Sequence, residues 1–249
     1  MREEDLINRE GVYARKVKIT SENTDVNGRM SILSIASNMQ DAAGDQLIDL
    51  GIGFDVTSSM DLLWVVVWSE FTFQRIPMAG EEVTFYTWPG KKMHWFYPRR
   101  AYVFGENGEE LIHASYLWML MDAKTRKTTE DKGILGVMPV VAYDDECRVP
   151  QMKMAFPEHL SNTCMRKVKD DQIDNNRHLN NAYYLDWIDQ IAKGSCFSGD
   201  QPKSLWINYK KELLPGDEVE IAYEPREGEL FFSGASTGGH HFTAKMIYT

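Results

Sequence analysis

Two short stretches of the sequence decide the fold, because one repeats the other. Residues 25–30 read DVNGRM and residues 174–179 read DNNRHL, and each stands directly before a segment with helical periodicity. A second matching pair, GEEV at residues 80–83 and GDEV at residues 216–219, follows each of these segments. Self-similarity of this kind indicates an internal repeat. We therefore expect two similar halves joined in tandem.

The offset between the two halves falls along the chain. It is 149 residues for the stretches before the helices and 136 residues for the stretches after them. The first half must therefore hold additional residues between its helix and its later strands. We expect these residues to form a longer helix-to-strand connection.

The first half reads as one long helix followed by strands. Apolar residues recur every three or four positions over residues 31–50, which is typical of an amphipathic helix, and Gly51 is a typical helix-ending residue. Strands are expected at residues 63–75, 82–88, 95–104 and 111–121. The GENG sequence at residues 105–108 indicates a hairpin turn, since Asn-Gly accepts the positive φ of tight turns.

The second half repeats this order. A helix is expected over residues 179–192, where apolar side chains fall on one face and Gly194 follows. Strands are expected at residues 205–211, 218–223, 229–235 and 241–248. Because no helices separate these strands, a doubly wound α/β fold is disfavoured. We expect an α+β protein in which each half packs a helix on an antiparallel sheet.

The segment between the halves has the composition of a linker. Residues 138–157 contain three prolines and the acidic run DDE at residues 144–146. We therefore expect an N-terminal half at residues 1–137, a linker at residues 138–157 and a C-terminal half at residues 158–249.

Charge and composition exclude several classes of function. The chain of 249 residues has 27 Lys+Arg against 37 Asp+Glu, a net charge of −10, which argues against nucleic-acid binding by phosphate neutralisation. No apolar run approaches the ~20 residues that span a bilayer, and the charged start resembles no secretion signal. Three widely spaced cysteines, Cys147, Cys164 and Cys196, predict neither a disulfide framework nor a zinc site. We expect a cytoplasmic protein, bacterial because a transit peptide is missing, without a cofactor or metal.

The two pre-helix stretches differ at a position that matters for chemistry. The first has Arg29 where the second has His178, and an unperturbed histidine titrates near neutral pH. In an extended segment alternate residues share a side, which brings Asp174, Asn176 and His178 together. Glu212, one strand later, adds a second carboxylate. A carboxylate, an amide and an imidazole before a helix N-terminus suit hydrolysis of an activated acyl group.

The same residue types also have an ordinary structural use. Asp, Asn and His before a helix commonly serve as capping and turn residues. Asn180 or Asn181 can cap the helix without any role in chemistry. A non-catalytic acyl-binding module therefore stays open at this point.

Five ordered stretches resemble one enzyme family. They lie at residues 17–29, 63–66 (LWVV), 114–121 (ASYLWMLM), 174–181 (DNNRHLNN, with Tyr184 and Trp187) and 209–212 (YKKE). In order and spacing they are similar to the acyl-acyl carrier protein (acyl-ACP) thioesterases of plant plastids and bacteria. The similarity runs over nearly the whole chain.

This resemblance implies a double hot dog fold, in which each half is a long helix wrapped by a curved antiparallel sheet. It implies hydrolysis of the thioester that joins a fatty acyl chain to acyl carrier protein, which releases the fatty acid and ends elongation. The family's catalytic group falls on Asp174, Asn176, His178 and Glu212. The first half would then hold the acyl chain while the second half reacts.

One position departs from the family pattern. Plant members often carry a Cys directly after the catalytic Glu, and this chain has Leu213 there. A Cys–His mechanism is therefore unsupported. Two routes stay open: attack by a water activated by Glu212 and His178, or direct attack by the Asp174 carboxylate.

The implied partner constrains the surface. Acyl carrier proteins are generally acidic, so a chain of net charge −10 would meet one through a local basic patch. Arg166, Lys167 and Lys169 run into the DNNRHL stretch and are the docking candidates. A homodimer is also compatible with the sequence.

Other functions and sites are weaker candidates. A hot dog acyl-CoA thioesterase or hydroxyacyl dehydratase would use a similar His and carboxylate, and is the alternative enzyme class. His240 and His241 are adjacent, and neighbours on a strand point to opposite faces. We therefore expect them at a surface or turn and not at a metal.

Overall fold

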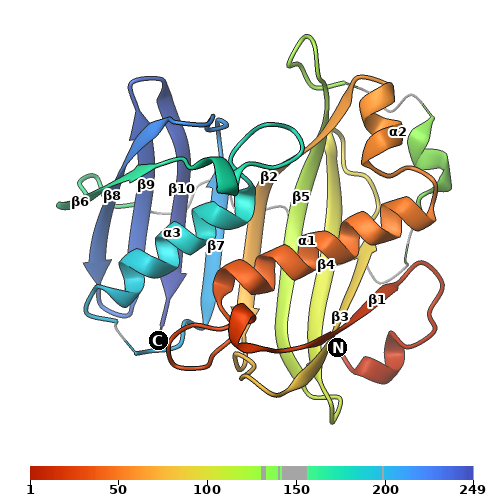
Figure 1. Cartoon of the computed structure of the whole chain (residues 1–249), viewed down its shortest axis with the longest axis horizontal. Coiled ribbons are helices and arrows are strands. Elements are labelled where there is room, and N and C mark those ends of the chain that lie inside the picture. Colours follow the sequence, from red (N-terminus) through yellow and green to blue (C-terminus); the bar gives the residue numbers. More distant parts are fainter. Residues whose placement is uncertain (130–132, 140, 142–155, 198, 249) are drawn as a thin grey trace. The chain divides into compact units, whose positions relative to one another are not determined.

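The computed structural model divides the chain into two compact units (Figure 1). It describes residues 1–129, 133–139, 141, 156–197 and 199–248. Unit 1 comprises Met1–Val67 and Gln74–Arg148, and unit 2 comprises Trp68–Phe73 and Val149–Thr249. Most of the expected linker at residues 138–157 lies outside the described residues.

Unit 1 packs one long helix on a sheet whose strand order is β1-β3-β4-β5-β2. Its strands are β1 (Tyr13–Lys18), the first six residues of β2 (Leu62–Phe73), β3 (Glu82–Pro89), β4 (Phe96–Gly105) and β5 (Glu110–Asp122). The pairs β1/β3, β3/β4 and β4/β5 are antiparallel. Helix α1 (Ile32–Asp49) lies along one face of this sheet in Figure 1, and the short helix α2 (Phe54–Ser59) follows it.

The sequence of α1 explains both of its ends. Ser31 caps the N-terminus, where its side chain accepts a hydrogen bond from the backbone N–H of Ser34 at 3.1 Å. Gly51 adopts φ +71°, the left-handed conformation that commonly terminates a helix. The apolar face predicted from periodicity is buried. The helix expected over residues 31–50 is therefore confirmed.

Unit 2 repeats this plan with the strand order β2-β7-β10-β9-β8-β6. Its strands are β6 (Asn162–Lys167), β7 (Ser204–Tyr209), β8 (Glu218–Arg226), β9 (Glu229–Ser236) and β10 (Gly239–Ile247), with the last six residues of β2. All neighbouring pairs in this order are antiparallel. Helix α3 (Asn181–Lys193) lies on one face of the sheet (Figure 1). The predicted α+β architecture is confirmed.

The falling offset between the halves has a different main cause from the one we expected. Helix α1 has 18 residues and α3 has 13. Strand β2 has 12 residues and β7 has 6. The helix-to-strand connections, residues 50–61 and 194–203, are nearly equal in length. Most of the additional residues therefore lengthen the helix and the strand of the first half, and the connection contributes little.

Two short strands and one short α-helix were not predicted from the sequence. Strands β1 and β6 have six residues each, and in both the exposed side chains outnumber or equal the partly buried ones. Helix α2 spans only six residues. Such segments bury too little apolar surface to show a clear period. No helix in the described part of the chain has the length and apolarity that a membrane span requires.

The core of unit 2 is built on aromatic contacts under α3. The Tyr184 ring meets the rings of Tyr209 and Phe242 edge-on, with centroid distances of 5.4 and 5.5 Å. Gly234 on β9 lies against the buried Phe242 ring, so that a Cβ at this position would overlap the ring. The sheet can hold Phe242 in this place only because residue 234 has no side chain.

We expect Gly234→Ala to destabilise the protein by about 1–3 kcal/mol, because overpacking a closed core forces side chains and backbone to shift. The matched control is Gly44→Ala in α1, where a Cβ meets nothing within 4 Å. This control should be stabilising, since Ala favours helix over Gly by roughly 0.5–1 kcal/mol. Urea unfolding measures both changes. Equal unfolding midpoints for the two variants would contradict the packing described.

Candidate active site

The loop before α3 is closed by Asp174. Its Oδ1 accepts hydrogen bonds from the backbone N–H groups of Asn176 at 2.8 Å and His178 at 3.1 Å. The Asp174 N–H donates to the His178 carbonyl at 2.8 Å, and the Arg177 N–H donates to the Asp174 carbonyl at 3.0 Å. Arg177 has φ +66°. These hydrogen bonds fix the backbone positions from which the side chains of Asn176 and His178 extend.

The helix that follows is capped by a different residue. The Asn180 side-chain oxygen accepts a hydrogen bond from the Ala182 N–H at 2.9 Å. The capping use expected for this stretch is therefore confirmed at Asn180. Asp174 does not cap α3 and instead shapes the loop in front of it.

Unit 1 contains the same loop. Asp25 Oδ1 accepts from the N–H groups of Asn27 at 2.9 Å and Arg29 at 3.2 Å. The Gly28 N–H donates to the Asp25 carbonyl at 3.0 Å, and Gly28 has φ +75°. The internal repeat is therefore confirmed at the level of single hydrogen bonds. The aspartate forms these bonds in both loops, although only the second loop has a histidine.

Asn176 presents an unpaired polar atom. Its Oδ1 is buried and has no hydrogen-bond partner among the described residues. Buried side-chain amides are normally hydrogen-bonded, and an exception calls for an explanation. A side-chain amide can accept a hydrogen bond through its oxygen or donate one through its nitrogen. The Asn176 amide is therefore suited to contact a bound molecule.

A backbone hydrogen bond brings Glu212 to His178. The Leu179 N–H donates to the carbonyl of Leu213 at 2.8 Å, which joins the loop to the residue after Glu212. His178 Nε2 then lies 3.6 Å from Glu212 Oε2. The His178 side chain is 18% exposed and that of Glu212 is 41% exposed, so solvent reaches the pair. This distance exceeds a direct hydrogen bond, and catalytic contacts commonly tighten only around substrate.

Unit 1 keeps the scaffold and lacks the pair. The Met30 N–H donates to the Pro77 carbonyl at 2.8 Å, which is the counterpart of the bond to Leu213. Ile76, which is buried, therefore stands where unit 2 has Glu212. The substitution of Ile76 for Glu212 escaped the sequence analysis. The 136-residue offset already aligns the two residues and was the signal that could have revealed it.

Two family models match the chain. The acyl-ACP thioesterase N-terminal domain matches residues 10–131, and the acyl-ACP thioesterase C-terminal domain matches residues 158–244. The chain belongs to the acyl-ACP thioesterase family. The resemblance seen in the five sequence stretches is thereby confirmed.

Relatives in this family are similar over most of the chain. Dodecanoyl-[acyl-carrier-protein] hydrolase of Cinnamomum camphora is 27% identical over 220 residues, which are 81% of this chain and 56% of the relative. Oleoyl-acyl carrier protein thioesterase 2 of Arabidopsis thaliana is 23% identical over 239 residues, 84% of this chain and 61% of the relative. The chain thus spans about half to three-fifths of the length of these thioesterases.

Solved structures show the same fold. An acyl-ACP thioesterase from Bacteroides thetaiotaomicron superimposes with a TM-score of 0.84 at 19% identity, covering 100% of both chains. The 12:0-ACP thioesterase from Umbellularia californica gives a TM-score of 0.84 at 22% identity, covering 97% of this chain and 98% of the other. The expected double hot dog fold of this thioesterase family is therefore confirmed.

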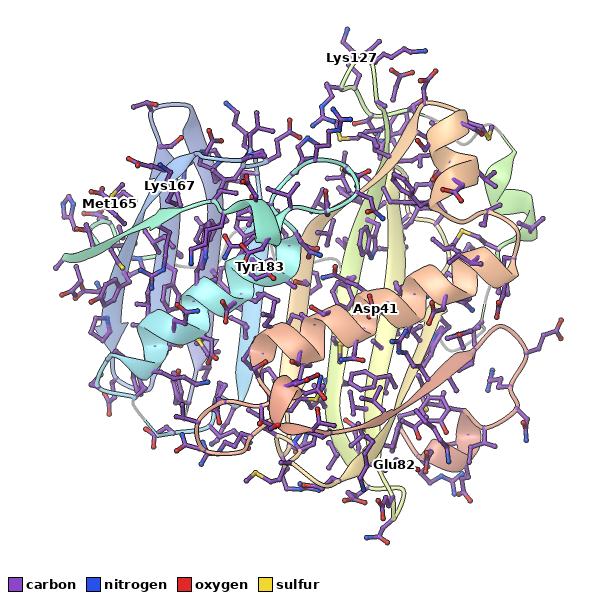
Figure 2. The ribbon with its side chains drawn as sticks, in the orientation of Figure 1. Asp41, Glu82, Lys127, Met165, Lys167 and Tyr183 are labelled. Atoms are coloured by element: carbon purple, nitrogen blue, oxygen red, sulfur yellow. The ribbon has the colours of Figure 1, made fainter. Side chains whose placement is uncertain are left out.

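The three docking candidates in this acyl-ACP thioesterase family member do not share one face. Lys167 and Lys169 are exposed, and Lys167 Nζ lies 3.7 Å from Glu218 Oε1. Arg166 is partly buried, and its Nη1 donates to the Cys164 Sγ at 2.7 Å. Figure 2 labels Lys167 on β6. Neighbours on a strand point to opposite faces, which separates Arg166 from Lys167 on β6.

The segment from β6 to α3 is nevertheless compact. The Tyr183 hydroxyl, labelled on α3 in Figure 2, donates to the Asp171 carbonyl at 3.4 Å. The Asn180 N–H donates to the Gln172 carbonyl at 2.9 Å. Lys169 stands directly before this turn. Lys167 and Lys169 therefore precede, by only a few residues, a hydrogen-bonded turn that leads into the loop with His178.

The adjacent histidines at the β9–β10 turn have different surroundings. His240 is exposed, as expected for a surface or turn residue. His241 is only 2% exposed, so the same expectation is wrong for it. Among the described residues no group of three His, Cys, Asp or Glu side chains is placed to hold a metal ion.

Proposed function

We propose that this protein hydrolyses the thioester of fatty acyl-ACP and releases a free fatty acid, which ends chain elongation in fatty acid biosynthesis. One observation carries the proposal. The loop scaffold occurs twice, and among the described residues the copy in unit 2 alone combines His178, Glu212 and the unpaired side-chain oxygen of Asn176. Membership in the acyl-ACP thioesterase family supports the same activity. We place the enzyme in the bacterial cytoplasm.

The reaction that this geometry supports is attack by water. Glu212 and His178 together activate a water molecule: His178 accepts its proton as the water oxygen adds to the thioester carbonyl, and the Glu212 carboxylate stabilises the imidazolium that forms. The Asn176 Nδ2–H group donates a hydrogen bond to the carbonyl oxygen, and the positive end of α3 also stabilises the negative charge that develops there. The tetrahedral intermediate then expels the thiolate, which takes the proton from His178. The products are a fatty acid and the free thiol of the carrier.

Asp174 has a positioning role in this proposal. Its Oδ1 is occupied by two backbone N–H groups, and Asp25 makes the same two bonds in the loop without a histidine. Because the aspartate makes the same contacts in both loops, its presence is explained by a role in shaping the loop. This observation favours the water route over direct attack by the Asp174 carboxylate.

The two halves would divide the work. We assign the acyl chain to the N-terminal half, residues 1–137, because its loop has Arg29 and Ile76 in place of the titratable pair. The buried face of its helix α1 consists largely of small and flexible side chains, Ala36, Met39 and Ala42 among them. Reaction would take place in the C-terminal half, residues 158–249.

We also propose that the exposed side of β6 docks the acidic carrier protein. Lys167 and Lys169 would contact the carrier directly, while Arg166 lies behind them and adds positive charge. The ion pair of Lys167 with Glu218 is exposed and therefore weak, so a carrier carboxylate can replace it.

Removing either member of the pair should abolish most of the turnover. We expect His178→Ala and Glu212→Gln each to lower kcat by on the order of 10²-fold or more, the usual contribution of acid–base groups. The assay follows free thiol and free fatty acid from a panel of acyl-ACP and acyl-CoA thioesters, with His240→Ala as the control. Near-native turnover of both variants would refute the assignment. An unsaturated product would indicate a dehydratase, and binding without turnover a binding module.

The role of Asp174 is tested by an isosteric change. Asp174→Asn keeps an acceptor oxygen for the two backbone N–H groups and removes the attacking carboxylate. We expect its kcat to stay within about 10-fold of the wild type, equivalent to roughly 1.4 kcal/mol in the barrier. Asp174→Ala should lose more activity, because the loop loses both hydrogen bonds. An Asp174→Asn enzyme as slow as His178→Ala would instead support direct attack.

Docking is tested by reversing a charge on β6. Lys167→Glu should raise KM for acyl-ACP and leave KM for acyl-CoA unchanged, because only the carrier would contact β6. Lys18→Glu is the matched control, since Lys18 is paired in register with Glu82 on β3 as Lys167 is with Glu218 on β8. Equal changes in KM for both substrates, or equal effects of the two variants, would rule out this docking site.

A further inference from the structure

His241 is a buried histidine that the proposed reaction does not use. It lies at the start of β10 and is 2% exposed. Its Nδ1 lies 3.2 Å from the carbonyl oxygen of Lys211 and 3.1 Å from that of Glu212. Its Nε2 lies 2.7 Å from the Ser236 Oγ. The ring therefore links the β9–β10 turn to the backbone of a proposed catalytic residue.

The partners of the ring determine which nitrogen carries the proton. A carbonyl oxygen only accepts hydrogen bonds, so Nδ1 must be the N–H donor to Lys211 and Glu212. In the neutral ring Nε2 then accepts from the Ser236 hydroxyl. The Ser236 Oγ accepts in turn from the Gly238 N–H at 3.0 Å. Burial lowers the pKa of His241, which favours this neutral form.

A β-bulge turns this side chain into the protein. On β10, His240 pairs with Ala235 and Phe242 pairs with Gly234, so His241 is an additional residue without a partner on β9. Bulges re-aim side chains and are frequent beside active sites. Because of the bulge, both His241 and Phe242 are buried although they are neighbours.

Unit 1 provides the comparison that separates structure from function. On β5 the register shifts in the same way, and Leu111 is the residue without a partner on β4. The Leu111 carbonyl accepts from the N–H groups of Gln74 and Arg75, as the His241 carbonyl accepts from those of Lys210 and Lys211. The backbone of the bulge therefore forms equally well with a buried leucine.

The histidine is present only in the unit that has the titratable pair. Leu111 occurs with Arg29 and Ile76, and His241 occurs with His178 and Glu212. The hydrogen bonds of the His241 ring go to the backbone of Lys211 and Glu212, and a leucine side chain at the equivalent position of unit 1 has no N–H group that could donate such bonds. A buried imidazole with three polar contacts is costly unless these contacts are all made. Its presence here is explained by the placement of Glu212.

We propose, on the basis of the hydrolysis proposed above, that His241 is a positioning residue that fixes the Glu212 carboxylate against His178. The Glu212 carbonyl is held by His241, and the carbonyl of the next residue, Leu213, is held by Leu179. His241 also holds the Lys211 carbonyl, so this one ring fixes the peptide groups on both sides of the Glu212 α-carbon, from which the Glu212 side chain leaves the backbone. Without His241 these two contacts would be lost, and the contact between Leu179 and Leu213 would remain.

Three substitutions of His241 separate this role from packing alone. His241→Asn places an amide nitrogen near the position of Nδ1, where it can donate to the Glu212 carbonyl. His241→Gln places its amide near the position of Nε2, on the side of Ser236. His241→Ala removes both contacts.

We expect His241→Ala and His241→Gln to lower kcat on acyl-ACP by about 10-fold to 10²-fold with KM nearly unchanged, since small misplacements of catalytic groups cost this much. His241→Asn should recover most of the lost kcat, and His240→Ala should leave kcat unchanged.

Two kinetic results would overturn the proposal. One is a His241→Ala enzyme with the kcat of His240→Ala. The other is a loss of kcat that follows protein stability alone. In that case the kcat values of His241→Asn, His241→Gln and His241→Ala would rank in the order of their unfolding midpoints, whether or not the new side chain donates to the Glu212 carbonyl. Recovery by Asn and not by Gln supports the positioning role, because the two amides differ in which contact they restore.

A second measurement keeps the proposal separate from the proposed activity. If the wild-type protein hydrolyses no acyl-ACP, the proposed function fails, and hydrogen exchange still tests the contact. Amides of residues 210–213 should exchange faster in His241→Ala than in His240→Ala, with Asn between them. Unchanged exchange in that segment would overturn the role of His241, whatever the activity.

Discussion

The backbone hydrogen bond from Leu179 to the Leu213 carbonyl is the constraint on which the rest of unit 2 depends. It joins the loop in front of the helix to the segment that leaves β7. Without it, His178 and Glu212 would belong to two unrelated turns, since 34 positions of sequence separate them. The equivalent bond from Met30 to Pro77 shows that this constraint belongs to the fold and not to the chemistry.

The two units separate what the fold needs from what a reaction needs. Both retain the aspartate that closes the loop, the residue with positive φ and the bulge on the strand beside the site. They differ in the side chains that a proton transfer would use. Function resides in sites carried by a fold, and here one chain carries the same scaffold with and without a candidate site.

The sequence predicted the parts of the molecule that bury regular apolar patterns. Helix α1 and the central strands follow from periodicity, and the four proposed site residues follow from the repeated stretch and the family resemblance. Short edge strands escaped because β1 and β6 expose much of their surface. His241 escaped for a different reason: strict alternation places adjacent residues on opposite faces, and a bulge breaks that alternation.

The shared bulge has a consequence for how such a site can arise or be built. Leu111 and His241 occupy the same kind of backbone irregularity, so the more demanding feature, a distorted strand that turns a side chain inward, is already present in the unit without the pair. To introduce the candidate site into unit 1, one would substitute the side chains of Arg29, Ile76 and Leu111 and would keep the backbone as it is. In a duplicated scaffold of this kind, side chains at a few positions decide which copy can carry the reaction.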